Sequence, residues 1–475
     1  MKNWTFYVWV IYAFDNMDDF IMYGINKKRC ITTMYSIEQF GAVGDGVTNN
    51  TDAISRTIET CTQKGGGTIY VPAGIFVTGA IELKSNMHLY LEAGAELFFT
   101  SDLAQYPMIS SNWEGVKRDV YMPCIYAHDA KNIAITGFGT LNGNGAFWWG
   151  LFNEGVLNYP RPKLLSFDYC ERVHIEQVKM IDSPSWTIHP NCCENVTIQG
   201  VTIINPATSP NTDGINPESC RNVKISNCYI DVGDDCIAIK AGTEDAECAI
   251  PCENITITNC TMLHGHGGVV FGSEMSGDIR NVVVSNCVFE GTDRGIRFKS
   301  RRGRGGTIEN IHINNIVMED VICPFVLNLY YYFGPRGLEP YVSNKKAQPV
   351  NDLTPIFKHI HFSNITATKI TAAAGFLYGL PEMPIEDITF SHIRVAMKPG
   401  ALPDLPAMMV DLEPMKQQGF FCSNVKEIVF ERVTVSQHEG PAFYIENSEN
   451  ISIEHCRSTE TEKVEELVQM LNVIV

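Results

Sequence analysis

The sequence predicts an all-β protein, a right-handed parallel β-helix of about ten coils. A short segment of alternating apolar and polar residues recurs eleven times, and successive copies start 23 to 49 residues apart. Such alternation is typical of a half-buried strand. A unit this short cannot bury its apolar side alone, so the copies must stack on one another. The clearest copies begin at Asn195, Asn222, Asn254, Asn281 and Asn310.

Other architectures fit the sequence less well. A leucine-rich repeat would need a Leu-x-x-Leu-x-Leu frame and helical segments, and neither is present. The 475 residues are 45% hydrophobic, which excludes disordered and collagen-like chains. Because 54 acidic side chains outnumber 36 basic ones, the net charge is −18, which argues against a general nucleic-acid or anionic-membrane binder.

The first 33 residues do not follow the repeat. Residues 4–14 are apolar and long enough for a signal peptide, but too short to cross a bilayer, which takes about 20 residues. No small-residue cleavage site follows, and Lys27, Lys28 and Arg29 come later. We expect residues 1–33 to lie outside the fold, residues 34–475 to form a single β-helix domain, and the protein to be cytoplasmic. Secretion is the alternative if the apolar run is a signal.

The two ends of the stack need covering, because an open β-helix exposes unpaired strands. Residues 51–61 carry apolar residues at the 3.6-residue period, with Asn50 and Thr51 as N-cap candidates, and glycines 65–67 follow. This segment predicts an N-terminal capping helix. Residues 460–472 also predict a helix, at the other end.

Two side-chain ladders are expected within the stack. One is a row of asparagines at a turn, and the other is a neighbouring row of buried cysteines: Asn227, Asn259, Asn286 and Asn315, then Cys228, Cys260 and Cys287. Sixteen cysteines are too dilute for a disulfide scaffold, so we interpret them mainly as buried thiols. Cys192 with Cys193, or Cys248 with Cys252, could instead bind metal or form bridges, but no second pair has zinc spacing.

Acidic residues gather in successive coils. Asp234 and Asp235 follow Asp213 by 21 and 22 residues, and His266 follows Asp235 by 31. Since these intervals approximate one coil, the side chains should stack on one face. Three adjacent carboxylates cannot all ionise easily, so at least one pKa should rise, which provides the acid and the base for glycoside hydrolysis. The alternatives are a calcium site or a turn-capping ladder of aspartates.

Basic residues follow one coil later. Six positive charges occur within eleven residues: Arg294, Arg297, Lys299, Arg301, Arg302 and Arg304. Arg297 and Lys299 alternate on a strand and therefore face the same side, next to the acids. A guanidinium and an ammonium there suit a substrate carboxylate, which favours an acidic sugar polymer. We expect the last three arginines to lie in a solvated turn.

The four motifs together resemble a known family. Asn211-Thr212-Asp213, Gly233-Asp234-Asp235, Gly265-His266-Gly267 and Arg297-Phe298-Lys299, in this order, are similar to the signature of the polygalacturonases, family 28 of the glycoside hydrolases. The resemblance covers roughly residues 35–455, and its one departure is Phe298, where isoleucine is commoner.

The resemblance implies hydrolysis of α-1,4-linked galacturonic acid with inversion and without a metal or cofactor. By this resemblance Asp234 is the general acid, and Asp213 and Asp235 activate the water. His266 then supports the protonation of the acid, and Arg297 and Lys299 hold the substrate carboxylate. Inversion predicts carboxyl groups about 6.5–9.5 Å apart.

Three further residues are candidates for substrate binding. His189 and Lys240 belong to coils that neighbour the acids, and Tyr331 lies in an aromatic run that could stack on sugar rings or simply cover the coil. The expected partner is an acidic polysaccharide or oligogalacturonide, with no nucleic acid and no membrane, and the oligomeric state stays open.

The mode of action is predicted from the segments around the motifs. Residues 272–277 and 291–297 resemble the bacterial exo-acting branch, and the insertions 242–251 and 329–353 could close one end of a groove. We therefore expect release of units from the non-reducing end. The alternatives are an endo-polygalacturonase, a rhamnogalacturonan hydrolase, a calcium-dependent pectate lyase and a non-catalytic polysaccharide-binding β-helix.

Overall fold

The computed structural model describes residues 33–247, 250–334, 336–460 and 467–474. Residues 33–475 group into one compact unit. The prediction for residues 1–33 falls outside the described residues, apart from Thr33. Within the described part of the chain, no helix is long and apolar enough to cross a membrane.

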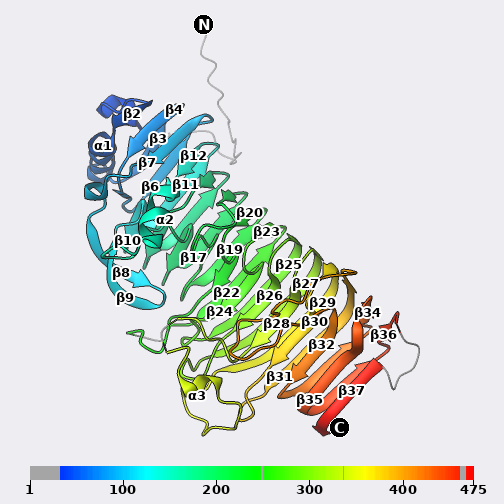
Figure 1. Ribbon diagram of the computed structural model, residues 1–475. Coiled ribbons are helices and arrows are strands. Elements are labelled where there is room, and N and C mark those ends of the chain that lie inside the picture. The colour runs from blue at the N-terminus through cyan, green and yellow to red at the C-terminus, as the bar shows by residue number, and fades with distance from the viewer. Residues whose placement is uncertain (1–32, 248–249, 335, 461–466, 475) are drawn as a thin grey trace, which may run out of the picture. The chain divides into compact units, whose positions relative to one another are not determined.

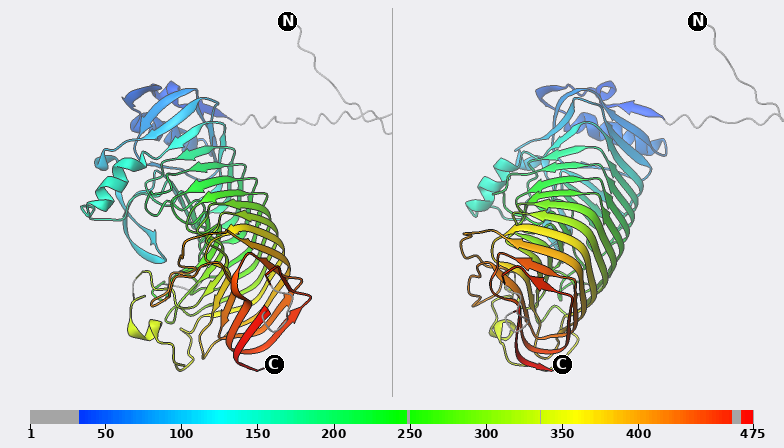
Figure 2. Two further views of the ribbon diagram at one scale, coloured as in Figure 1. Left: turned by 45° about the vertical axis from the view of Figure 1, so that its right-hand side comes forward. Right: turned by 90° about the vertical axis from the view of Figure 1, so that its right-hand side faces the viewer.

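The chain winds into a parallel β-helix, as predicted, whose coils present three faces (Figures 1 and 2). The face that carries the candidate site, called here the site sheet, contains β5 (Ile81–Glu82), β10 (Ile125–His128), β13 (Leu165–Asp168), β16 (Ile188–Asn191), β21 (Ile237–Ile239), β24 (Val269–Gly272), β26 (Arg294–Lys299), β28 (Cys323–Asn328), β30 (Ala373–Tyr378), β32 (Gln418–Ser423) and the start of β35 (Glu439–Glu454). Isolated bridges from Ile215 to Ile188 and Ile237 make this sheet continuous.

The second face is the longest. It contains β1 (Met34–Ser36), β3 (Gly67–Val71), β6 (Met87–Leu91), β11 (Lys131–Gly137), β14 (Glu171–Glu176), β17 (Glu194–Gln199), β19 (Arg221–Ser226), β22 (Cys252–Thr258), β25 (Ile279–Glu290), β27 (Thr307–Glu319), β29 (Ile356–Ile370), β31 (Ile385–Met397), β33 (Val425–Glu431), part of β35, and β37 (Val468–Ile474). The stack is thus longer than the sequence repeat: strands that lack the repeat motif, such as β1 and β37, extend it at both ends.

The third face completes each coil. It contains β2 (Asp45–Asn49), β4 (Gly74–Thr78), β7 (Ala95–Phe99), β12 (Thr140–Asn142), β15 (Lys179–Ile181), β18 (Thr202–Ile204), β20 (Tyr229–Val232), β23 (Thr261–His264), the second halves of β25, β27, β29 and β31, then β34 (Thr434–Ser436) and β36 (Arg457–Ser458). Outside the stack, the described residues form an antiparallel hairpin of β8 (Met108–Trp113) and β9 (Val116–Tyr121), the helices α1 (Thr51–Gln63), α2 (Gly145–Asn153) and α3 (Pro340–Ser343), and the 3₁₀ turns η1 (Ile37–Phe40) and η2 (Leu103–Gln105).

Ladders of like residues hold the coils in register. The predicted asparagines all adopt a left-handed corner, with φ near 57°, a conformation that asparagine tolerates better than most residues. Asn259 donates to Asn227 at 3.3 Å and Asn315 to Asn286 at 2.7 Å, whereas Asn286 donates to Thr258. Inside, Phe298 stacks on Phe271 at 4.3 Å, so the residue that departs from the family signature is core.

The cysteines are buried thiols, as predicted. The described cysteines form no disulfide, and twelve of the fourteen are buried, including the row Cys228, Cys260 and Cys287. Cys248 lies outside the described residues. Cys193 and Cys252 contact backbone groups of neighbouring coils, which fits the prediction of small core residues.

The two predicted end caps have different outcomes. Helix α1 lies across the N-terminal end of the stack and buries the predicted face of Ala53, Ile54, Thr57, Ile58 and Cys61. The predicted helix over residues 460–472 is wrong for its described end, because residues from Val468 onward form β37, which pairs with β35. The open edge of β35 offers main-chain partners, and this pairing overrides the local helical preference. Residues 461–466 lie outside the described residues.

Candidate active site

The three acids come together at the edge of the site sheet, as the repeat spacing predicts. Backbone hydrogen bonds align their coils: Thr187 donates to the Asp213 carbonyl at 2.8 Å, Gly214 to that of Asp235 at 3.0 Å, and Cys236 to that of Gly267 at 2.8 Å. The coils are therefore in register where each enters the sheet. One oxygen from each of Asp213, Asp234 and Asp235 lies within 4.8 Å of the others.

This spacing corrects one expectation. Inversion predicts carboxyl groups about 6.5–9.5 Å apart, and the nearest oxygens are closer than that. The reason is the tight stacking of successive coils, since parallel strands lie only about 4.8 Å apart. A cluster of three carboxylates is also a conceivable cation site, but the cations that face it are protein side chains, Lys240, Arg297 and Lys299.

The three carboxyl groups have different surroundings. Asp213 is buried, and its Oδ2 accepts from Asn216 Nδ2 at 2.9 Å. Asp235 is buried too, with Oδ2 at 2.7 Å from Lys299 Nζ and Oδ1 at 3.4 Å from Arg297 Nη1. Asp234 is the most accessible of the three, with 21% of its side chain exposed, and its Oδ1 lies 3.3 Å from His266 Nδ1.

These surroundings separate the protonation states. Burial, together with the neighbouring Asp234, raises the pKa of Asp213 well above its ordinary value. Burial also acts to raise the pKa of Asp235, but Lys299 and Arg297 outweigh it and lower this pKa to about 2. The hydrogen bond to Asp234 raises the pKa of His266. The site therefore combines two carboxyl groups with opposite shifts: the raised pKa of Asp213 favours its protonated form, and the lowered pKa of Asp235 favours its ionised form.

Arg297 and Lys299 lie beside the acids, but their first partner is Asp235. Both side chains are less than 10% exposed. Among the described residues, Arg297 Nη2 is buried and has no hydrogen-bond partner, so this nitrogen is a donor available to a ligand. The prediction that both residues face the acids is thus consistent with the geometry, and the salt bridges with Asp235 add a role that the sequence did not indicate.

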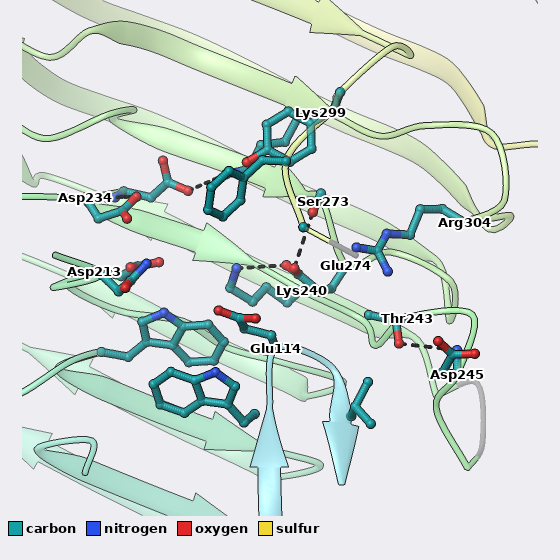
Figure 3. Close-up of a pocket in the computed structure, with 18 of the residues that line it drawn as sticks. Glu114, Asp213, Asp234, Lys240, Thr243, Asp245, Ser273, Glu274, Lys299 and Arg304 are labelled. Atoms are coloured by element: carbon teal, nitrogen blue, oxygen red, sulfur yellow. Dashed lines mark hydrogen bonds and ion pairs between the residues drawn. The ribbon is translucent and has the colours of Figure 1, made fainter. Parts of the chain in front are cut away.

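Two cavities meet above the acids. The first, of about 320 Å³, extends from Asp213, Asp234 and Asp235 to Lys240, Glu274 and Arg304 (Figure 3). The second, of about 370 Å³, shares Asp234, Lys299 and Tyr331 with the first and continues past His266 and Arg297 to Phe152 of α2 and Met408. The acids therefore lie where the two cavities join.

The secondary candidates separate into two groups. Lys240 lines the first cavity and pairs with Glu274 at 2.9 Å, and Tyr331 lines both cavities with Lys299 Nζ 5.3 Å from its ring centre. His189 was predicted as a substrate contact, but its side chain is fully buried between Lys163, at 2.8 Å, and Glu218, at 3.0 Å. The imidazole ring of His189 packs on Trp186, which lines the first cavity, so His189 supports the cavity from beneath.

The prediction of a solvated turn for Arg301, Arg302 and Arg304 is wrong. All three are at most 4% exposed. Arg301 and Arg304 reach the two oxygens of Glu244, at 2.7 and 2.6 Å, and Arg302 binds Glu382. Arg301 and Arg304 are buried against Glu244 of the insertion 242–251, whereas Arg302 is buried against Glu382, which lies outside this insertion.

Three segments distant in sequence close the first cavity at one end. They are the β8–β9 hairpin, the insertion 242–251 and the insertion 329–353, and they are called here the end wall. Thr243 Oγ1 lies 3.4 Å from the Gly115 carbonyl, and Arg336 reaches Asp245 at 3.2 Å. The two insertions were predicted to close a groove, whereas the hairpin was not found in the sequence because its strands lie outside the repeat.

Sequence reasoning also missed several lining residues. Trp113 and Glu114 come from the hairpin, and Trp186 stacks on Trp113 at 5.6 Å between ring centres. Glu274 lies beside Lys240 and Trp186 beside His189, so their nearness to predicted site residues could have identified them. Nothing in the sequence places the hairpin against these coils.

Comparison with known proteins agrees with this geometry. Residues 61–402 match the model of glycosyl hydrolases family 28. A probable polygalacturonase of Vitis vinifera is 35% identical over 378 residues, covering 77% of this chain and 75% of that protein. An exopolygalacturonase of Zea mays is 28% identical over 373 residues, covering 76% and 83%.

Solved structures give the same result. The exopolygalacturonase of Thermotoga maritima superposes with a TM-score of 0.69 at 32% identity, covering 77% of this chain and 87% of that one. A family 28 exopolygalacturonase of Yersinia enterocolitica, at 21% identity, shares the fold with a TM-score of 0.65 over 93% of this chain and 77% of that one.

Proposed function

The chain belongs to family 28 of the glycoside hydrolases, and we propose that it acts from the non-reducing end of the galacturonan chain. It is a hydrolase of the polygalacturonase type, and its substrate is an acidic pectic polysaccharide. The observation that carries this proposal is the end wall. It closes the first cavity beyond Lys240 and Glu274, whereas the second cavity continues past Phe152, which is 45% exposed. We propose that a polymer therefore enters the first cavity only with its last units.

The size of the first cavity supports the same mode. Its volume of about 320 Å³ is near the lower limit of the range of about 300–1,000 Å³ for ligand pockets. It suits the end of a chain rather than a long internal stretch. The terminal sugar then fills the closed cavity, the scissile bond lies above Asp234, and the remaining polymer leaves through the second cavity.

Asp234 serves as the general acid in this proposal. Its accessible carboxyl faces both cavities, and it transfers a proton to the glycosidic oxygen as the bond to C1 breaks. His266, whose pKa is raised by its hydrogen bond to Asp234, returns a proton to this carboxyl from the solvent side. Support for these roles comes from the accessibility of Asp234 relative to its two neighbours.

Asp235 serves as the base. Its low pKa, about 2, keeps it ionised, and each of its oxygens retains a lone pair beyond its contact with Lys299 or Arg297. It accepts a proton from the water that attacks C1. The raised pKa of Asp213 favours its protonated form, and Asp213 positions this water. The resemblance gave Asp213 and Asp235 the same role, whereas in this proposal their roles differ.

We propose inversion in spite of the short carboxyl spacing. Both oxygens of Asp235 are held by cations, and the raised pKa of Asp213 favours its protonated form, so both groups are poor nucleophiles for a covalent intermediate. Proton NMR of the fresh product tests this assignment: inversion gives the β-anomer first. Initial α-anomer would indicate retention, to which spacings of about 5–5.5 Å normally belong.

The product profile from polygalacturonate tests the proposed function. Steady release of monogalacturonate, without new ultraviolet absorbance, is the expected result, because one terminal sugar fills the first cavity. A spread of oligomers would indicate an endo enzyme, and absorbing products would indicate a lyase. No products would direct the search to rhamnogalacturonan or to a binding function.

A cytoplasmic location remains part of the proposal. The buried thiols, such as Cys193, Cys220 and Cys252 in consecutive coils, favour a reducing compartment. Fractionation of cells that express the native gene, with N-terminal analysis of the product, tests it. A mature chain that starts between residues 20 and 33 and is found outside the cell would contradict it.

A further inference from the structure

We infer that Glu114, at the tip of the β8–β9 hairpin, binds the free C4 hydroxyl of the terminal sugar and thereby selects an intact non-reducing end. This inference rests on the proposed exo mode. Glu114 lies outside the four motifs and is thereby assigned a role in specificity, which is to bind the C4 hydroxyl of the substrate.

The position of Glu114 is the first step. It lies in the turn between β8 and β9, and its side chain is directed into the first cavity beside Lys240 and Glu274 (Figure 3). Asp213 and Asp234 lie at the other end of this cavity, where it joins the second. A sugar bound above the acids therefore presents its far end to Glu114.

Glu114 lacks a partner of its own. In the part of the chain that the structure describes, no hydrogen bond or ion pair within 4 Å is found for its carboxylate. Three cations act on Glu114: Lys240 is engaged by Glu274 at 2.9 Å, Arg304 is engaged by Glu244 at 2.6 Å, and the exposed Arg118 of the same hairpin forms no ion pair with Glu114 within 4 Å. Burial, with the charge of Glu274, raises the pKa of Glu114. A carboxylate shielded from water in this way gains most from a ligand that donates a hydrogen bond.

The hairpin tip is held in place. Asn112 accepts from Lys163 Nζ at 2.6 Å, Trp113 stacks on Trp186, and Gly115 packs on the insertion. A Cβ at Gly115 would lie 2.6 Å from Thr243 Cγ2, and φ there is +79°, so this contact requires glycine. Glu114 is thus fixed before substrate binds, as a specificity residue should be.

The chemistry selects one hydroxyl. In its ionised form the Glu114 carboxylate only accepts hydrogen bonds, so a ligand of this form must donate one. The C4 oxygen of an internal galacturonate is part of a glycosidic bond and carries no proton, whereas the terminal unit has a free C4 hydroxyl. Sites built around a substrate hydroxyl strongly reject analogues that lack it, because a buried polar group is then left unpaired. The end wall adds a steric barrier against a further sugar.

Two trisaccharides isolate this contact. One is saturated trigalacturonate, and the other is the 4,5-unsaturated trimer that a pectic lyase produces, whose terminal ring lacks the C4 hydroxyl. Initial rates are measured by chromatography for the wild type, Glu114→Ala and Glu114→Gln. Asp119→Ala is the matched control, because it removes an exposed acid from the same hairpin outside the cavity.

The expected result is a loss that depends on the substrate. Removing a hydrogen bond to a charged group lowers kcat/KM for the saturated trimer by roughly 10- to 150-fold in Glu114→Ala. The same variant leaves kcat/KM for the unsaturated trimer within a few-fold of the wild type, so the preference for the saturated end disappears. Glu114→Gln, which still accepts a hydrogen bond, retains part of the preference, and Asp119→Ala retains all of it.

Two results would overturn the inference: equal losses on both trimers, or no loss on the saturated trimer in a Glu114→Ala protein with a wild-type circular dichroism spectrum. Either would leave the exo assignment intact as long as the wild type still releases terminal units. A wild type that cleaves internal bonds would instead refute the exo mode, so the two failures are distinguishable.

Discussion

The ion pair between Lys299 and Asp235 makes the strongest quantitative prediction. Substituting Lys299→Met removes a buried ammonium 2.7 Å from a carboxylate that is 2% exposed. The pKa of Asp235 falls from its ordinary 3.8 to about 2. At 1.36 kcal/mol per pH unit, this shift corresponds to roughly 2 kcal/mol. Losing one partner of a buried pair costs about 3–5 kcal/mol. We therefore expect the free energy of unfolding at pH 7 to fall by about 2–5 kcal/mol.

The pH dependence gives the sign. Because the folded-state pKa of Asp235 is lowered, this stabilisation is present above pH 3.8 and is lost as the pH falls through about 2. Urea denaturation, followed by tryptophan fluorescence, should thus show a large difference between wild type and Lys299→Met at pH 7. The difference should shrink progressively as the pH is lowered below about 4.

A matched control separates this pair from an ordinary one. Lys358 pairs with Glu309 at 3.4 Å, with both side chains nearly 30% exposed. Lys358→Met should cost no more than about 1 kcal/mol. The reasoning is refuted if the two variants lose the same stability at pH 7, or if the deficit of Lys299→Met is unchanged in acid.

Three further predictions follow from the site. Because burial and Asp234 raise the pKa of Asp213 above 3.8, its proton is favoured in the folded state. Asp213→Asn should therefore raise the urea midpoint at pH 7 and have no effect below about pH 4, and a loss of stability at pH 7 would contradict this. Glu244→Ala removes the acid that the buried Arg301 and Arg304 share, so the end wall should loosen. Chromatography should then detect longer products from polygalacturonate. An unchanged product profile would show that the wall does not depend on this contact. Chelator should leave the rate unchanged, because Lys240, Arg297 and Lys299 balance the three carboxylates, whereas loss of activity that calcium restores would indicate a metal at this cluster.

The repeat made the fold predictable from sequence. Its Asn and Cys positions recur because each coil needs a left-handed corner and a small buried side chain at the same point. Once the coils are stacked, residues one repeat apart must be neighbours, which is why Asp213, Asp234, Asp235 and His266 could be placed together. The capping helix was predictable for a local reason, its 3.6-residue apolar period.

What the repeat does not contain was not predictable. The β8–β9 hairpin contributes Trp113 and Glu114, and the hairpin is held by contacts with residues between 51 and 128 positions away, which no local sequence pattern predicts. The buried arginines were misassigned for the same reason, since the acids that they bind, Glu244 and Glu382, lie in other segments of the chain. His189 lies in a coil beside the acids, as predicted, but its side chain is fully buried and does not line the cavity, because spacing does not give burial. The C-terminal strand depends on the open edge of β35, which only the assembled stack provides.

Cleavage of trigalacturonate labelled at its reducing end tests the central claim most directly, with wild type compared with Asp234→Asn. Asp231→Asn is the control, because Asp231 also contacts a histidine, His264 at 2.7 Å, but outside both cavities. The account predicts unlabelled monomer and labelled dimer as the first products, a loss of about 10²–10⁴-fold in Asp234→Asn, and wild-type rates in Asp231→Asn. Labelled monomer as the first product, or an Asp234→Asn protein as active as the wild type, would contradict it.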